Sequence, residues 1–295
     1  MKINYTEPDH KVNQGAPEGL SGVLLNVALI ALTVFLFIFV LRYTISLAAP
    51  HIPFSVELKL RGIFSTFVSG YTLKDSAEVE DYLENLVGDV KRNFASEVPD
   101  VSATALCIKE ENAFALPGAQ IVITSGLINE LDSEEELLFV LSHEVGHIVH
   151  RDNMKGLGEM LLQVGLAVVL GPFLPQETGS VFSNTNIWTS RSFTRAQEYK
   201  ADDFGVMVLA KEVGSVAASL SVFDKFNKME EKMGIRKGDL AQSLSATHPH
   251  SLDRSKRVKL GEFKNLLTEI QRNSASFSNF KQAVKEKCAL QLAKD

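Results

Sequence analysis

Two histidines four residues apart, with a glutamate between them, are the residues in this sequence best suited to chemistry. They are His143, Glu144 and His147, in the segment Ser142-His-Glu-Val-Gly-His147. Residues four apart project from the same face of an α-helix, so both imidazoles can reach one metal ion. Glu144 lies about 100° further round that helix, beside the ion rather than on it. This spacing is typical of zinc hydrolases, in which the glutamate takes a proton from a zinc-activated water and delivers it to the leaving amine.

A catalytic zinc ion has three protein ligands and one open position, so a third ligand must come from elsewhere in the chain. His150 follows on nearly the same helix face, but it lies about 10 Å along the axis from His143, too far to share one ion. The downstream carboxylates that can serve are Glu159, Glu177, Glu198 and Glu212. Glu198 is preferred, because Asp202 follows it by one helical turn and can accept the N–H of a ligand imidazole. The competing interpretation of Glu198 is an ordinary ion pair on a helix surface.

Three segments, in this order, resemble the motif set of the HtpX-type membrane-associated zinc metallopeptidases, a gluzincin family that includes the CaaX prenyl endopeptidases. They are His143-Glu-Val-Gly-His147, Arg195-Ala-Gln-Glu198-Tyr-Lys-Ala-Asp202, and Thr247-His248-Pro249 with Arg254. The resemblance covers roughly residues 55–260. It implies one Zn²⁺ ion per subunit, held by His143, His147 and Glu198, with Glu144 as the catalytic base and a protein or peptide as substrate.

The resemblance also gives roles to a strand and to a histidine outside the two ligand helices. The strand consists of Asn112, Ala113, Phe114, Ala115 and Leu116, and is similar to the family's strand that borders the cleft and pairs with an extended substrate. The simpler interpretation is that Phe114 and Leu116 pack the sheet. His248 is similar to a histidine that donates to the tetrahedral oxyanion. Its alternatives are a fourth zinc ligand in a resting enzyme or an ordinary loop histidine, and Arg254 is expected to anchor its loop through a carboxylate.

The hypothesis that follows is a membrane-anchored zinc endopeptidase that processes membrane or envelope proteins or controls their quality. The alternative is a non-catalytic, membrane-tethered binding or chaperone-like protein with a structural zinc ion. Such a site is closed by four protein ligands, with His248 as the fourth. Glu144 argues against that alternative, because a structural site has no need of its carboxylate. A third hypothesis keeps the zinc hydrolase but replaces the peptide with another amide.

An apolar segment near the start of the chain predicts contact with a lipid bilayer. Val23–Leu41 carries nineteen residues without a charge, close to the ~20 that a bilayer core requires. The competing interpretation is a cleavable signal peptide, since Ser46-Leu47-Ala48 resembles a cleavage site. The preceding head is barely basic, which favours an uncleaved anchor. The predicted domains are a flexible polar head (1–22), a transmembrane anchor (23–45), the zinc metallopeptidase domain (55–260) and a helical tail (261–295).

The elements that must position these residues predict a mainly helical α+β fold, zincin-like in the minimal gluzincin form, with a small β-sheet and one preceding transmembrane helix. A helix is expected to begin at Asp75 or Ser76, and Ser133 with Glu136 forms a capping box ahead of the zinc helix. Residues 103–128 suggest a small antiparallel sheet, and the alternation at 54–60 suggests a linker and strand. Met160–Leu174 is interpreted as a buried or membrane-facing helix near the active site, with a second span as the alternative.

Composition excludes other classes of protein. The net charge of −6 and the lack of a densely basic segment argue against a nucleic-acid partner. The two cysteines, Cys107 and Cys288, are too few for a disulfide scaffold or a cysteine-ligated zinc site. The expected location is a bacterial inner membrane, crossed once, with the catalytic domain on the periplasmic side, although few charges flank the span. The sequence specifies neither the physiological substrate nor the oligomeric state.

Overall fold

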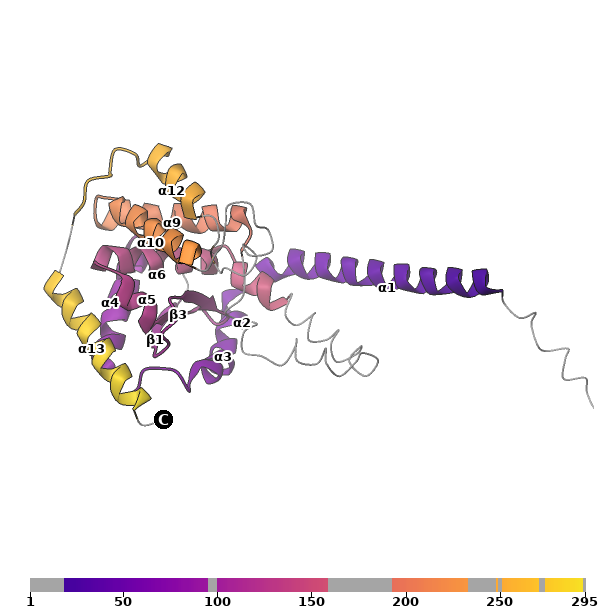
Figure 1. Cartoon of the computed structure of the whole chain (residues 1–295), viewed down its shortest axis with the longest axis horizontal. Helices are drawn as coiled ribbons and strands as arrows, with labels where there is room; N and C mark the ends of the chain where they lie inside the picture. Colours follow the sequence, from indigo (N-terminus) through magenta and orange to yellow (C-terminus); the bar gives the residue numbers. More distant parts are fainter. Residues whose placement is uncertain are drawn as a thin grey trace, which may run out of the picture. The chain divides into compact units, whose positions relative to one another are not determined.

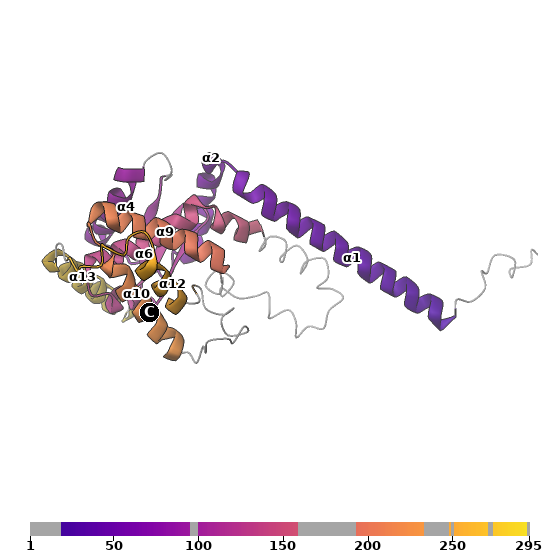
Figure 2. The ribbon, with the colours of Figure 1, turned by 90° about the horizontal axis from the view of Figure 1, so that it is seen from above.

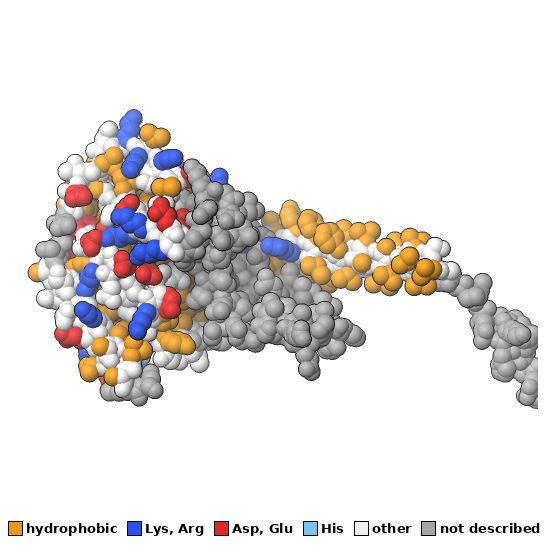
Figure 3. Space-filling model, viewed as in Figure 1, with side chains coloured by type: hydrophobic (Ala, Val, Ile, Leu, Met, Phe, Trp, Pro, Cys, Tyr) orange, Lys and Arg blue, Asp and Glu red, His pale blue; other side chains and the backbone are white. Residues whose placement is uncertain are grey.

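The computed structural model describes residues 19–94, 100–158, 193–232, 248, 251–270 and 274–293 (Figure 1). The chain divides into two units, Met1–Ile45 and Ser46–Asp295. Most of the described first unit is helix α1 (Leu20–Ala48). By length and composition α1 can cross a membrane, and it is the only such helix among the residues that the structure describes. Figure 3 shows apolar side chains along α1, whereas acidic and basic side chains are interspersed on the second unit.

The segment after α1 is helical, so the strand predicted at residues 54–60 is wrong. It forms four short elements, η1 (Ala49–His51), α2 (Phe54–Glu57), η2 (Leu58–Leu60) and α3 (Arg61–Val68). Pro53 precedes α2 in an extended conformation, which a helix start tolerates because proline has no N–H to donate. Helical spacing turns Phe54 and Leu58 together toward the core, an arrangement that a strand's alternation also permits. The short apolar pattern therefore did not distinguish the two structures.

The sheet has three strands, β1 (Ser102–Leu106), β2 (Ala113–Leu116) and β3 (Gln120–Thr124). Their order is β1-β3-β2, so that β2 lies at an edge. β2 pairs antiparallel with β3, Phe114 opposite Val122. β1 pairs parallel with β3, Ala103 opposite Ile121. The expectation of an antiparallel sheet is therefore correct only for β2 and β3, which a tight turn with Gly118 at φ 96° connects. Parallel pairing depends on a crossover that strand patterns do not encode.

Helices surround this sheet and form a continuous core with it, which makes the fold mainly helical with a small sheet, as predicted (Figure 1). They are α4 (Ala77–Phe94), α5 (Ser125–Glu130), α6 (Glu134–Val149), α9 (Arg195–Glu212), α10 (Ala217–Lys232), α12 (Ser251–Leu260) and α13 (Ser274–Leu292). α4 packs on β1, α6 on β2 and β3, and α9 on α6; α10 contacts α6 and α12 (Figures 1 and 2). Ser133 caps α6 by accepting the Glu136 N–H at 3.2 Å.

Helices α6 and α9 approach each other closely because glycines lie at their contact. A Cβ atom on Gly146 would lie 2.9 Å from Ala201 Cα, and one on Gly205 would lie 2.9 Å from the Phe139 ring. Gly146 therefore cannot be enlarged without moving a helix, and Gly205 cannot be enlarged without displacing the buried Phe139 ring. This close packing brings the side chains of α6 and α9 to one site.

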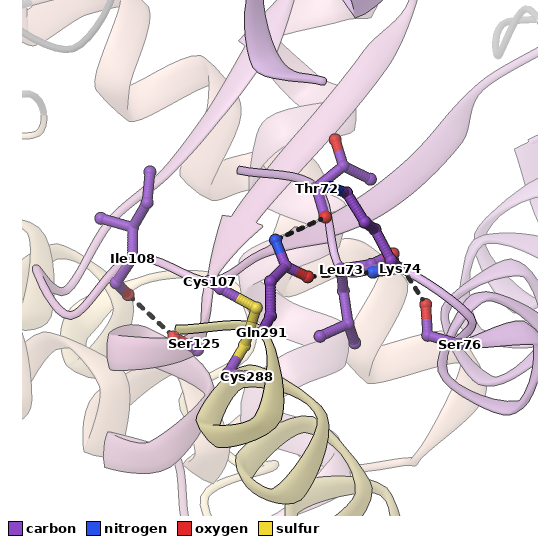
Figure 4. Close-up of a disulfide and its surroundings, with 9 residues drawn as sticks. All are labelled: Thr72, Leu73, Lys74, Ser76, Cys107, Ile108, Ser125, Cys288 and Gln291. Carbon is purple, nitrogen blue, oxygen red and sulfur yellow. Dashed lines mark hydrogen bonds between the residues drawn. A yellow bond between two sulfur atoms is a disulfide. The ribbon is translucent and has the colours of Figure 1, made fainter. Parts of the chain in front are cut away.

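The C-terminal helix α13 is held against the rest of the second unit by its apolar face and by a disulfide. Phe277, Phe280 and Val284 are buried in the core. Cys288 forms a disulfide with Cys107, which directly follows β1 (Figure 4). Beside it, the Gln291 side chain accepts the Lys74 N–H and donates to the Thr72 carbonyl, both at 3.2 Å. The sequence allows only this one pairing within the chain, but it does not show that α13 brings Cys288 next to the end of β1, 181 positions away.

Candidate metal centre

Four side chains from three segments converge in the interior of the second unit. His143 and His147 come from α6, Glu198 from α9, and His248 from the chain ahead of α12. One ligand atom from each lies within 4.8 Å of the others. The two Nε2 atoms of α6 are 3.2 Å apart, and each lies 3.6 Å from a Glu198 oxygen. His248 Nδ1 lies 3.0 Å from Glu198 Oε1.

Both α6 imidazoles have the second ring nitrogen paired with an aspartate. His143 Nδ1 lies 3.1 Å from Asp202 Oδ1, and His147 Nδ1 lies 3.1 Å from Asp152 Oδ2. An Nδ1–H that donates to a carboxylate leaves Nε2 unprotonated and directed at a metal. Imidazole nitrogens with one carboxylate are the donor set that zinc prefers in catalytic sites. The residues present therefore fit a zinc ion.

Asp152 was missed by the sequence analysis. Helix α6 ends at Val149, and Arg151 adopts a positive φ of 63°, so that the chain reverses and returns Asp152 to His147. Helical spacing predicts only side chains on the helix itself. The available signal was a carboxylate five positions after the second histidine, and its contact depends on a turn that sequence periodicity does not predict.

Arg254, fully buried on α12, contacts two carboxylates of α9, those of Glu198 and Asp202. Its Nη1 lies 2.8 Å from Glu198 Oε2, and its Nη2 and Nε donate to the two Asp202 oxygens at 2.6 and 2.8 Å. Nη1 also donates to the His248 carbonyl at 3.3 Å. Burial alone would raise the pKa of Glu198, but the Arg254 guanidinium, His248 and His147 together outweigh burial and hold that pKa well below its usual range. Glu198 is therefore an anionic donor.

The two α6 histidines experience different electrostatic surroundings. Burial lowers the pKa of His143, and the hydrogen bond to Asp202 only partly compensates. Burial also acts to lower the pKa of His147, but hydrogen bonds to Asp152 and Glu198 outweigh it and raise the pKa to about 9. A site that retains a proton on His147 at neutral pH has an excess of negative charge. A divalent cation can neutralise that charge when it replaces the proton.

Glu144 projects from α6 beside the four converging side chains. It is 1% exposed, and its Oε1 lies 3.4 Å from His248 Nε2. Its Oε2 and His248 Nε2 have no hydrogen-bond partner among the described residues. Buried polar atoms without partners are uncommon outside functional sites. A carboxylate oxygen and an imidazole nitrogen are thus available to a bound molecule at the same place.

Phe193 contacts the metal centre, and the sequence analysis did not single it out. It lies just before the Thr194 cap of α9. Its ring stacks on His147 at 3.8 Å between centroids and lies 5.7 Å from the ring of His248. The sequence shows only an aromatic residue next to a helix cap, which has no distinctive spacing.

The remaining predicted residues lie elsewhere or outside the described part of the chain. Asn112 precedes edge strand β2, which contains Ala113–Leu116 and packs against α6 rather than joining the ligand residues. His150 ends α6, with Nδ1 2.7 Å from the Gly146 carbonyl, and Glu212 pairs with Arg92 at 2.9 Å. Glu159, Glu177 and the segment Met160–Leu174 lie outside the described residues.

Two imidazoles and a glutamate on one helix, facing a carboxylate from a second helix beside a small sheet, define a zincin-like protein. The model of peptidase family M48 matches residues 74–260 of the chain. Those residues include α6, α9, α12 and the whole sheet. The chain belongs to peptidase family M48.

Several curated proteins are similar to this chain. The mitochondrial metalloendopeptidase OMA1 of Arabidopsis thaliana is 31% identical over 163 residues, 55% of this chain and 32% of that protein. The putative beta-barrel assembly-enhancing protease of Vibrio cholerae is 28% identical over 195 residues, 60% of this chain and 37% of that protein. A protease HtpX homolog of Pyrobaculum calidifontis is 27% identical over 228 residues, 65% of this chain and 62% of that protein. The chain therefore matches less than two thirds of the length of each.

Proposed function

We propose that this chain is a membrane-anchored, zinc-dependent endopeptidase. The observation that carries the proposal is the convergence of the His143 and His147 Nε2 atoms with Glu198, beside a Glu144 oxygen that has no partner among the described residues. Zinc, when bound by His143, His147 and Glu198, supplies a Lewis acid that polarises a peptide carbonyl and lowers the pKa of water.

The proton transfers are assigned to Glu144. Its Oε2, which has no hydrogen-bond partner among the described residues, takes a proton from the attacking water and then delivers it to the leaving amine. Burial at this position keeps bulk water from competing for that proton. Asp202 and Asp152 orient the two ligand imidazoles. Arg254 fixes the relative positions of Glu198, Asp202 and the His248 backbone by contacting all three.

His248 has two roles consistent with its contacts. Its Nε2 lies 3.4 Å from Glu144 Oε1 and has no hydrogen-bond partner in the described part of the chain, which suits a donor to the oxyanion that forms at the scissile carbonyl. Its Nδ1 faces Glu198 and His143, at 3.0 and 3.2 Å, which suits a fourth ligand in the resting protein. The second contact also favours the alternative function, a binding or chaperone-like protein whose zinc site is closed by four protein ligands.

Two substitutions in the full-length chain distinguish these functions. For the peptidase, we expect Glu144→Gln to keep its zinc while the cleavage rate falls by about 10²–10⁴-fold. We expect His248→Ala to keep zinc on three ligands while turnover falls. For a structural site, His248→Ala should lose zinc and Glu144→Gln should change nothing. The measurements are zinc content of the purified protein and cleavage of a library of internally quenched peptides. A Glu144→Gln protein with full peptidase activity would exclude the proposed mechanism.

Substrate recognition is assigned to edge strand β2. An edge strand carries unpaired backbone groups, and Ala113–Leu116 can pair with an extended peptide as an added strand. Asn112 at the start of the strand donates its N–H to Thr124 Oγ1 at 2.9 Å, which fixes the end of that strand. Substrates are therefore expected to bind in extended form, as unfolded or partly unfolded segments of proteins.

The cellular role we propose is processing or quality control of membrane or envelope proteins. The Vibrio cholerae relative carries the name of a protease that enhances assembly of β-barrel proteins, and α1 can hold this chain in a bilayer through residues 23–45. We infer a single-pass protein of a bacterial inner membrane with its catalytic domain on the periplasmic side. The Cys107–Cys288 disulfide supports that side, because disulfides persist in oxidising compartments and are rare in the cytosol.

A further inference from the structure

A second buried ionic cluster lies next to the metal centre and has no part in the proposed mechanism. Glu57, at the end of α2, is fully buried. One of its carboxylate oxygens accepts a hydrogen bond from the Arg151 guanidinium. The other accepts hydrogen bonds from Asn153 Nδ2 at 2.9 Å and from the Gly118 N–H at 3.3 Å. A buried carboxylate with three donors is fully satisfied, and such a network holds its members in one arrangement.

This cluster joins three parts of the second unit that are distant in sequence. Glu57 belongs to the segment after α1, Gly118 to the turn between β2 and β3, Arg151 to the turn that ends α6, and Asn153 to the helical segment 152–158 that follows. Asn153 Nδ2 also lies 3.4 Å from the Leu116 carbonyl, at the end of β2. Arg61 donates from Nε to the Gly118 carbonyl at 2.9 Å. The end of the edge strand is thus fixed from both sides.

Three consecutive side chains after α6 are divided between two clusters, Arg151 in the turn and Asp152 and Asn153 at the start of the helical segment 152–158. Arg151 and Asn153 point to Glu57, whereas Asp152 between them accepts from His147. Arg151 also lies over the Phe54 ring at 4.0 Å and donates to the Ile52 carbonyl. Because Asp152 lies between Arg151 and Asn153 in the chain, its position depends on the contacts that hold those two residues.

We propose that Glu57 is a positioning residue for the metal centre and for the substrate strand. Through Arg151 and Asn153 it fixes the turn that presents Asp152 to His147. It also fixes the end of β2 relative to α6. It does so by its hydrogen bond with the Gly118 N–H and by holding Asn153, whose side chain contacts the Leu116 carbonyl. For the substrate strand this proposal rests on the proposed peptidase function; for the metal it rests only on the ligand geometry.

The test uses two variants of the full-length chain in detergent. Glu57→Gln keeps the side-chain volume but removes the charge that holds Arg151, and Asn153→Ala removes the contacts to Glu57 and Leu116 while leaving the Glu57–Arg151 pair. The matched control is Tyr82→Phe, which removes one hydrogen bond to a buried carboxylate, Glu134 at 2.6 Å, at the opposite end of α6. The thermal midpoint of unfolding is measured for each protein. It separates a loss of folded protein from a displacement of Asp152 or β2 within a folded protein.

The first readout is zinc affinity, measured by competition with a chelating dye. We expect the zinc dissociation constant to rise about tenfold in Glu57→Gln and Asn153→Ala, the size of effect seen when a partner of a ligand histidine is disturbed. Tyr82→Phe should bind zinc like the wild type even if its thermal midpoint falls. Unchanged zinc affinity in both test variants, or an equal loss in Tyr82→Phe, would overturn the proposal for the metal centre.

The second readout is the dependence of KM on peptide length. Two internally quenched peptides are compared, a long one able to pair along Ala113–Leu116 and a short one that spans only the cleaved bond. In Asn153→Ala we expect KM to rise about tenfold for the long peptide with a much smaller change for the short one. Equal changes for both peptides would overturn the proposal for β2. If the wild type cleaves neither peptide, the peptidase function fails, while the zinc measurement still decides the role of Glu57.

Discussion

The imidazoles of His143 and His147 face the same ligand position but depend on aspartates from different elements. Asp202 lies on α9 one turn after Glu198, and Asp152 begins the helical segment 152–158 that follows α6. Each carboxylate fixes the tautomer and the ring plane of its histidine. The affinity for zinc should therefore depend on two residues that need not touch the ion.

We expect Asp152→Asn to weaken zinc binding by about 10–100-fold, because the amide no longer supplies the charge that orients His147. Asp203→Asn is the control, since Asp203 lies on α9 but pairs with Arg257 in a partly exposed ion pair. Zinc competition with a chelating dye measures both variants. Equal affinity of Asp152→Asn and the wild type would show that the Asp152 contact does not support the ligand.

The pKa of His147 predicts how the metal-free protein responds to pH. Because this pKa is raised from 6.5 to about 9, the protonated form stabilises the fold fully below pH 6.5, and this contribution is lost as the pH rises through 9. The thermal midpoint of the zinc-free chain should therefore fall between pH 7 and pH 9.5. In the same range zinc binding should release a proton, seen as a calorimetric enthalpy that varies with the buffer. A flat midpoint without proton release would contradict a protonated His147.

The ligand residues could be proposed from sequence for a physical reason. His143, Glu144 and His147 share one helix, and Glu198 and Asp202 share another, so that helical spacing alone predicts which side chains lie together. Asp152 follows the turn that ends α6, and Phe193 precedes the cap of α9, so no periodic pattern describes either position. The position of His248 relative to Glu144 likewise depends on α12 and Arg254, which tertiary packing brings to the site.

At the level of elements, the metal centre depends on how closely α6 and α9 pack. Gly146 lies between the two ligand histidines in sequence, and a Cβ there would overlap the α9 backbone at Ala201. The helices must separate to accommodate even one methyl group, which moves Glu198 away from His143 and His147.

We expect Gly146→Ala to lower the free energy of unfolding by about 1–3 kcal/mol, the usual cost of overpacking, and to weaken zinc binding as well. The matched control is Gly88→Ala within α4, where an added Cβ meets nothing within 4 Å. That control should raise the free energy of unfolding by about 0.5–1 kcal/mol through helix propensity. Urea unfolding of both variants gives the comparison. A stabilising effect of Gly146→Ala would show that α6 and α9 are less tightly packed.

Long helices with an apolar stripe and a cap, such as α4 and α6, were predictable, whereas the short elements were not. Residues 54–60 alternate like a strand, yet α2 and η2 are helical, because the partners of Glu57 and Phe54 are distant in sequence and decide the conformation. Similarly, the patterns of β1 and β3 identify strands but not their parallel pairing. Tertiary contacts determine both results.

At the level of the whole molecule, the disulfide connects the end of β1 to the last helix of the chain (Figure 4). It closes a loop of 181 residues that contains α6, α9 and the metal centre. A cross-link across so long a loop stabilises the fold mainly by restricting the unfolded chain. We expect the Cys107→Ser, Cys288→Ser double variant to lose about 2–4 kcal/mol in the free energy of unfolding. Urea unfolding measures this loss, and reductant should lower the wild type to the same value. A wild type insensitive to reductant would contradict the expectation.

The same disulfide gives a prediction about membrane topology. The second unit can keep its disulfide only in an oxidising compartment, so in a bacterial cell the catalytic domain should be periplasmic and residues before α1 cytoplasmic. In cells treated with a thiol-reactive polyethylene glycol maleimide after acid quenching, the wild type should gain no mass until it is reduced, and then should gain two adducts. The Cys107→Ser variant should gain one adduct without reduction, which checks that the remaining thiol is reachable. Two adducts on the unreduced wild type would place the domain in a reducing compartment.

An alkaline phosphatase fusion after α13 provides an independent measurement, because that reporter folds only outside the cytoplasm. The fusion to the full chain should be active. An inactive fusion would reverse the assigned orientation of α1.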